Sequence, residues 1–401
     1  MIPISKTMRK PIFMICMLAV SLFASAQKID RKHLSIGVDG RYSHILDGHN
    51  IYNDMLNSHN YGIYGINLGL STRPEDGGWF ERAFNYPTFG IGFSYATIST
   101  LNFRENARLG DIINLFGRAE FNLIRTRRFK AGPLLELGLG FSSQTYDYQQ
   151  NPMNKFIGSK VFAVFGTGLH AEWLFAKRWS LQAGVYLTHH SNGMTRSPNF
   201  GFNEVSVGIG VRHYLEDNTN TPKLAEAPAR PEYKKGINWN VLVAAGVHSC
   251  PTEFDGILAS DNPDRLAPAR FRGVVGMESV WRYHPIFGTG IGLEADFDAH
   301  NYRQTDILLA GKEDPDGYSP VRIGVYLKQE FWYRRVSVHI AGGVYLFKRC
   351  GLTEDISTTF EKIGIRYHFG HQGNGLFAGL DLRAHQFDRS YALEWSLGYG
   401  F

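Results

Sequence analysis

Beyond its first 26 residues, the sequence lacks a hydrophobic run long enough to form a membrane helix. Such a helix needs roughly 18 or more consecutive apolar residues, so the rest of the chain could enter a membrane only as strands. Charge is also scarce. Charged residues make up 20% of the chain, the formal net charge is +5, and no basic cluster indicates nucleic-acid binding.

Cysteine is nearly absent, with three residues in 401. Cys16 lies in the N-terminal apolar run and has no lipid-attachment context. Cys250 and Cys350 each follow a predicted strand of the same direction, and an exported protein can form disulfides. A bond between them would stabilise the second half of the chain. The sequence does not give their separation, so bonded and free thiols both stay open.

The N-terminus has the pattern of a secretory signal peptide. Lys6, Arg9 and Lys10 precede the apolar run 12–23, and Ala24-Ser25-Ala26 follows it. Positive charge, a short apolar segment and small residues before the cleavage site define such peptides. We therefore expect residues 1–26 to be removed and the mature chain to be exported.

Aromatic residues and glycine are abundant, at 14% of the chain and 44 residues respectively. Outer-membrane barrels need this mixture, because aromatic girdles flank an apolar outer face that alternates with a polar interior. Alternating segments predict eight strands in the first half, residues 27–215: 34–46, 60–71, 88–99, 111–124, 128–142, 158–175, 178–191 and 202–214.

A polar segment at 216–236, with prolines at 222, 228 and 231, reads as a linker. Alternation then resumes, and the second half, 237–401, contains eight more predicted strands: 237–248, 270–282, 286–298, 319–332, 335–347, 360–369, 375–386 and 391–401. The last ends in an aromatic residue, Phe401, which is typical of barrels inserted by the outer-membrane assembly machinery.

The two halves are an internal repeat, since similar segments recur at offsets of 198 and 195 residues. We predict an all-β fold of two consecutive antiparallel eight-stranded transmembrane barrels. The charged residues that point inward predict plugged lumens rather than open pores. A single sixteen-stranded barrel is the alternative, but the linker is long for a periplasmic turn, which is normally short.

The segment Thr188–Gly193 brings a nucleophile, a base and an amide together. Residues two apart in a strand share a face, so His189 and Ser191 continue the outward apolar row of their strand while His190 points inward. In the second half, the positions of His189 and Ser191 are taken by Ala384 and Gln386, so the pair is present once.

This segment resembles the PagL-type lipid A 3-O-deacylases, whose signature is His-x-Ser-Asn near the end of one strand and an acidic or amide residue early in the next. The resemblance covers roughly residues 30–215 and implies an outer-membrane esterase that removes the 3-hydroxyacyl chain from position 3 of lipid A in lipopolysaccharide. Ser191 would be the nucleophile, His189 the base, and Asn192 or the Gly193 amide would hold the oxyanion. The family requires no metal or dissociable cofactor.

The third catalytic member departs from the family pattern, which has glutamate at the position that orients the histidine. Aligned on Pro198, that position is Asn203, and Glu204 follows it. Asn203 belongs to the outward row, whereas Glu204 points into the lumen. We therefore expect Asn203 to orient His189, and Glu204 is the alternative through a local bulge.

Other interpretations compete with the catalytic one. His189 and His190 point to opposite faces, which disfavours a metal site, and we expect Asp381, Arg383 and His385 to pack inside the second barrel. The alternative function is a non-enzymatic outer-membrane barrel with a structural or binding role, in which the polar strand end hydrogen-bonds at the level of the lipid headgroups.

Overall fold

The computed structural model describes residues 34–46, 56, 58–73, 78–101, 108–218, 235–249, 269–299, 319–349, 357–370, 373–385 and 389–401. The predicted signal peptide, most of the predicted linker, Cys250, Cys350 and Gln386 lie outside these described residues.

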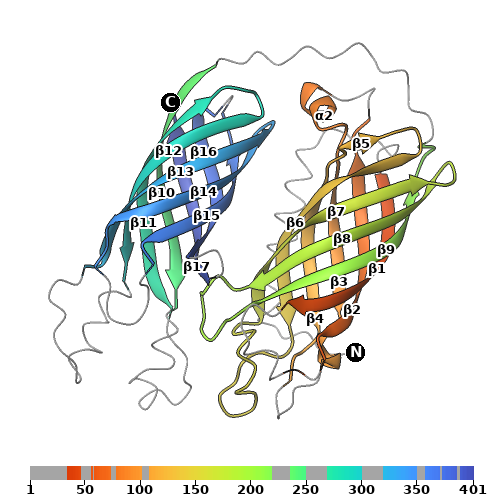
Figure 1. Ribbon diagram of the computed structural model, residues 1–401, viewed down its shortest axis with the longest axis horizontal. Coiled ribbons are helices and arrows are strands. Elements are labelled where there is room, and N and C mark those ends of the chain that lie inside the picture. The colour runs from red at the N-terminus through yellow and green to blue at the C-terminus, as the bar shows by residue number, and fades with distance from the viewer. Residues whose placement is uncertain are drawn as a thin grey trace.

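The first half of the chain forms a closed antiparallel barrel of eight long strands (Figure 1). In chain order they are β1 (Leu34–Leu46), β2 (Asn60–Ser71), β3 (Thr88–Ala96), β4 (Ile112–Glu120), β6 (Phe129–Ser142), β7 (Val161–Leu174), β8 (Trp179–Ser191) and β9 (Phe202–Tyr214). Pairing of β1 with β9 and of β4 with β6 closes the barrel.

Three short elements decorate the first barrel. The two-residue strand β5 (Ile124–Arg125) pairs with β6, helix α2 (Trp79–Ala83) lies between β2 and β3, and a 3-10 turn η2 (Ile98–Thr100) follows β3. The predicted strand 111–124 is therefore interrupted after Glu120. Within the described ranges, the chain contains no helix that is long and apolar enough to cross a membrane.

The second half forms its own closed eight-stranded barrel, in which β10 pairs with β17. Its strands are β10 (Gly236–His248), β11 (Arg270–Arg282), β12 (Phe287–Asp298), β13 (Val321–Tyr333), β14 (Val336–Phe347), β15 (Thr359–His368), β16 (Gly375–His385) and β17 (Arg389–Gly400). The prediction of two separate barrels is confirmed, and a single sixteen-stranded barrel is excluded.

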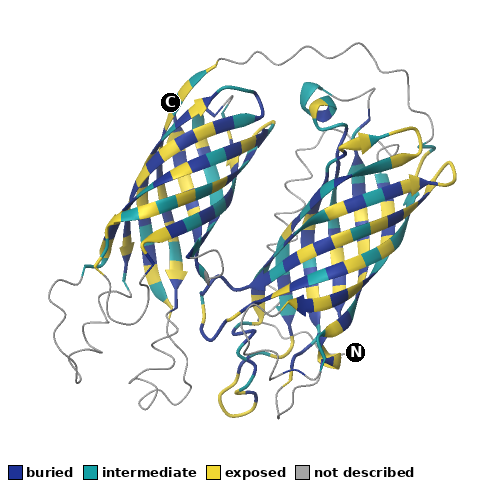
Figure 2. Cartoon of the chain, viewed as in Figure 1, coloured by how far each residue is buried: buried dark blue, intermediate teal, exposed yellow. Residues whose placement is uncertain are grey.

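Strict alternation along the strands gives each barrel an apolar exterior and a polar interior (Figure 2). On β8, Leu181, Val185 and Leu187 are 44–49% exposed, while Gln182 and Tyr186 between them are buried. An apolar outer band around a polar interior is what a barrel needs in order to sit in lipid.

Ion pairs fill the interior of the first barrel. The Glu136 carboxylate lies 3.1 Å from an Arg41 nitrogen and 2.5 Å from an Arg118 nitrogen. The Arg212 guanidinium lies 2.7 Å from Glu120 and 2.8 Å from Glu172. Buried charges are tolerated when they are paired in this way, and the paired side chains occupy the lumen.

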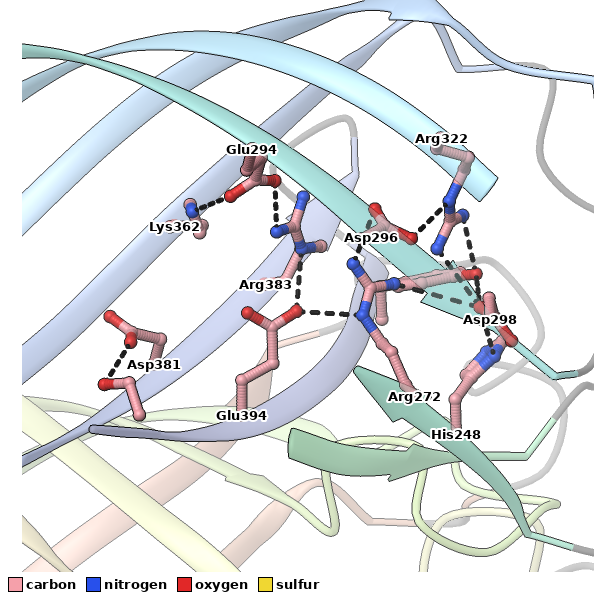
Figure 3. A network of polar contacts seen from close by, with 12 residues as sticks. His248, Arg272, Glu294, Asp296, Asp298, Arg322, Lys362, Asp381, Arg383 and Glu394 are labelled. Atoms are coloured by element: carbon pink, nitrogen blue, oxygen red, sulfur yellow. Dashed lines mark hydrogen bonds and ion pairs between the residues drawn. The ribbon is translucent and has the colours of Figure 1, made fainter. Parts of the chain in front are cut away.

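The second barrel has an equally dense network (Figure 3). Arg383 bridges Glu294 at 2.5 Å and Glu394 at 2.9 Å, and Arg272 joins Glu394 at 3.0 Å to Asp296 at 3.0 Å. The prediction that Asp381, Arg383 and His385 lie inside this barrel agrees with their burial at 0–4% exposure.

Helix α2 connects the two barrels at the end where β2 turns into β3. The Glu81 carboxylate lies 2.6 Å from Nε of Arg334 and accepts a hydrogen bond of 2.9 Å from the hydroxyl of Tyr333. The rings of Phe80 and Phe84 pack at 5.6–6.1 Å from the Tyr333 ring. The turn between β13 and β14 is therefore docked on the first barrel.

Candidate active site

His189 lies near the end of β8 and is paired in register with Asn203 at the start of β9. Its Nδ1 lies 2.8 Å from Oδ1 of Asn203. The amide oxygen can only accept, so Nδ1 donates the hydrogen bond and carries the proton. Nε2 of the neutral ring is then the basic nitrogen, and this is the tautomer that a general base requires.

Ser191 is the last residue of β8, and its side chain lies among hydrogen-bond donors. The Gly193 amide donates to its Oγ at 3.1 Å and the Asn199 side-chain amide donates at 3.0 Å. The same Oγ lies 3.3 Å from Oγ of Ser390, a residue of β17 in the second barrel. Ser191 is 4% exposed, so these groups enclose the hydroxyl.

The structure therefore splits the predicted site into two parts. His189 is joined to Asn203, and Ser191 is joined to the loop that follows β8. Among the described residues, His189 and Ser191 share no hydrogen bond. They lie two residues apart in the strand, a spacing that places their side chains on the same face.

The two predicted oxyanion donors, Gly193 and Asn192, donate to different acceptors. The Gly193 N–H points at Ser191 Oγ, and its φ of +63° is a conformation that glycine adopts readily. The Asn192 side-chain amide donates instead to the Arg196 carbonyl at 2.8 Å. Of the two, the Gly193 amide is the one directed at the nucleophile.

Glu204 and His190 lie on the opposite face of the same strands. Glu204 is 2% exposed inside the barrel, with Oε1 at 3.8 Å from Nε2 of His190. The His190 ring stacks on Phe202 at 4.4 Å. The sheet thus separates Glu204 from His189, and Asn203 is the one that touches the imidazole.

The sequence alone assigns no role to two contacts of Ser191. Asn199 directly follows Pro198 in the loop between β8 and β9 and lies inside the motif that resembles the family pattern. Ser390 is 199 residues from Ser191, and no local pattern links them. Within the part of the chain that the structure describes, no group of three or more His, Cys, Asp or Glu side chains is arranged to hold a metal ion.

This arrangement suits acyl transfer. A hydroxyl flanked by N–H donors can attack a carbonyl whose oxygen those donors then stabilise. An imidazole with a fixed tautomer on the same face can take the proton. Both groups lie at the end of β8 on the face that carries the barrel's outward apolar row.

Comparison with known proteins gives matches in both halves. Residues 66–212 match the family model "Lipid A 3-O-deacylase (PagL)", and residues 237–401 match "Acyloxyacyl hydrolase, C-terminal domain". No curated protein matches the chain significantly.

Among solved structures, the outer membrane enzyme PagL is similar at 16% identity and a TM-score of 0.30, over 43% of this chain and 97% of that one. Neisserial surface protein A is similar at 9% identity and a TM-score of 0.28, over 45% and 97%. By its family matches, the chain belongs to the lipid A 3-O-deacylase (PagL) family in its first half and carries an acyloxyacyl hydrolase C-terminal domain in its second.

Proposed function

We propose that the protein is an outer-membrane esterase that removes the ester-linked 3-hydroxyacyl chain from position 3 of lipid A. The observation that carries this proposal is the outward strand end at which Ser191 is held by two N–H donors, beside an imidazole whose Nδ1 is bonded to Asn203. The family match to lipid A 3-O-deacylases supports the substrate class.

In the proposed reaction, Nε2 of His189 takes the proton of the Ser191 hydroxyl as Oγ attacks the acyl carbonyl. The Gly193 and Asn199 amides stabilise the oxyanion. The intermediate collapses to an acyl-serine as its bond to the sugar oxygen breaks, and the imidazolium gives its proton to that oxygen, which leaves as a hydroxyl. Water, activated by the same imidazole, then releases a 3-hydroxy fatty acid and restores the serine.

Asn203 has the orienting role in this scheme. Its amide oxygen fixes the proton on Nδ1, so that Nε2 is free to act as the base. An amide carries no net charge and stabilises an imidazolium less than a carboxylate does. We therefore expect a slower enzyme than one with a carboxylate at this position. Phe401, exposed at the end of β17, fits recognition by the outer-membrane assembly machinery.

Expression in an outer membrane with intact lipid A tests the proposal. Mass spectrometry should show lipid A lighter by one 3-hydroxyacyl group, and Ser191→Ala should abolish that loss. Ser143→Ala changes a serine in another outer loop and should behave as wild type. Unchanged lipid A, with protein shown to be folded by heat-modifiable gel migration, would favour the non-enzymatic barrel instead.

A further inference from the structure

The ten-residue loop between β8 and β9 is attached to the second barrel as well as to the first (Figure 1). The Ser249 amide, directly after β10, donates to the Met194 carbonyl at 2.6 Å. The Ser197 amide donates to Oγ of Ser249 at 3.0 Å, and the Ser197 hydroxyl donates to the Ser249 carbonyl at 3.2 Å. Ser197 and Ser249 are both fully buried.

The same loop packs against the outer wall of the second barrel at Gly193. A Cβ atom at this position would lie 3.1 Å from Cβ of Leu393 on β17 and 3.9 Å from Cδ1 of Leu382 on β16. Close packing therefore favours glycine here, in addition to its φ of +63°. The backbone amide that points at the nucleophile is held against two leucines of the second barrel.

The Ser191 hydroxyl is the third point of contact. A hydroxyl oxygen accepts two hydrogen bonds and donates one, and Oγ of Ser191 already accepts from Gly193 and Asn199. It also lies 3.3 Å from Oγ of Ser390, a contact in which either hydroxyl can be the donor. The contacts of Oγ are thus made to the loop and to the second barrel.

The surfaces in contact come from corresponding parts of the two repeats. Strands β8 and β9 are the seventh and eighth of the first barrel, and β16 and β17 hold the same places in the second. At the position of His189, the second repeat has Ala384. The corner of the second barrel that has no such histidine is the one that contacts Ser191 and Gly193 of the first.

We propose that the second barrel is an integral part of the deacylase site, with Ser390 and Ser249 as positioning residues for the nucleophile and for the loop that carries its N–H donors. This inference rests on the proposed function. It gives the second repeat a role in the same reaction, without chemistry of its own.

Purified full-length protein, assayed on lipid A in detergent micelles, tests this. We expect Ser390→Ala to lower kcat by about 3- to 10-fold, as loss of one hydrogen bond does, and to leave KM within about two-fold of wild type. Ser390→Thr keeps the hydroxyl and should restore most of the rate. Ser396→Ala is the control, because Ser396 is a buried serine of the same strand that faces the lumen and donates to Asp381.

Ser249→Ala is a second variant that leaves the nucleophile's own contacts intact. It removes the acceptor for the Ser197 amide and should also lower kcat with little effect on KM. Heat-modifiable migration identifies variants that fold. If folded Ser390→Ala and Ser249→Ala both match wild type or exceed it, the inference is wrong while the proposed function stands. If the wild type has no activity that depends on Ser191, both are wrong.

Discussion

The two barrels are built alike and differ at one corner. Both have eight antiparallel strands, an apolar exterior and a lumen filled by buried ion pairs. At the end of the seventh strand, however, the first barrel carries His189 and Ser191, while the second has Ala384 at the position of the histidine. The closed barrel thus depends on features that are repeated along every strand. The candidate chemistry depends on a few outward residues at one strand end, which the fold does not need.

Replacing His189 should give the largest loss of activity, because it removes the general base. The variant has at this position the alanine that the second barrel has. We expect His189→Ala to lower kcat by about 10²- to 10⁴-fold, the usual contribution of a general base. His213→Ala changes a histidine at the other end of β9 and should retain activity. Near wild-type turnover of His189→Ala on lipid A micelles would show that His189 is not the base. The histidine would then not be the difference that matters between the two barrels.

Breaking a lumenal ion pair should affect the stability of either barrel. Arg212→Ala removes the guanidinium that Glu120 and Glu172 share, and Arg383→Ala removes the one that bridges Glu294 and Glu394. Removing one partner of a buried pair costs about 3–5 kcal/mol.

Urea unfolding, followed by tryptophan fluorescence in micelles, measures the free energy of unfolding for both variants. Arg178→Ala, at an exposed turn before β8, is the control and should stay within about 0.5 kcal/mol of wild type. A large loss of unfolding free energy in one variant and none in the other would mean that the two ion-pair networks do not contribute equally to stability.

Variants of Asn203 and Glu204 distinguish between the two candidates for the third catalytic member. Asn203→Ala removes the acceptor for His189 Nδ1 and should lower kcat about 10-fold, whereas Glu204→Gln changes a residue on the other face and should not alter kcat. Asn203→Asp supplies a carboxylate, which should stabilise the imidazolium and raise kcat at neutral pH. Loss of activity in Glu204→Gln with a fully active Asn203→Ala would reverse the assignment.

The contact through α2 should have the smallest effect. Burial alone would raise the pKa of Glu81, but hydrogen bonds from Arg334 and Tyr333 and the charge of Arg334 lower it below its usual 4.5. A carboxyl with a lowered folded-state pKa contributes stability that is complete above the unfolded-state pKa. That contribution is lost as the pH falls through the lower folded-state value.

Glu81→Gln should therefore destabilise the protein by about 0.5–1 kcal/mol at pH 7, because Arg334 is exposed and surface pairs contribute little. The difference from wild type should shrink below pH 4.5. Unfolding in urea at pH 7 and pH 4 measures both values. A difference that stays constant between the two pH values would assign the effect to packing rather than to charge.

The strands could be predicted from sequence because each carries its own alternation. The two ends of β1, β2, β9 and β11 coincide with the predicted ranges. The same alternation places Asn203 and Glu204 on opposite faces. The alternation does not predict the break after Glu120, because apolar residues on both sides of it continue the pattern into β5.

The surroundings of Ser191 could be predicted only in part. The Gly193 amide is two residues away and follows from the local motif. Ser390, Ser249 and Leu393 are brought to the site by the docking of one closed barrel on another, and that docking leaves no periodic signal in the chain. Long-range contacts of this kind require the structure.

The central claim is that Ser191 is the nucleophile of a lipid A esterase, and the most direct measurement is the mass of the peptide that contains it after an acid-quenched reaction with lipid A. We predict that this peptide gains the mass of one 3-hydroxyacyl group, and that hydroxylamine removes it. Deacylation with the acyl group on a different residue, or continuing in Ser191→Ala, would contradict the account.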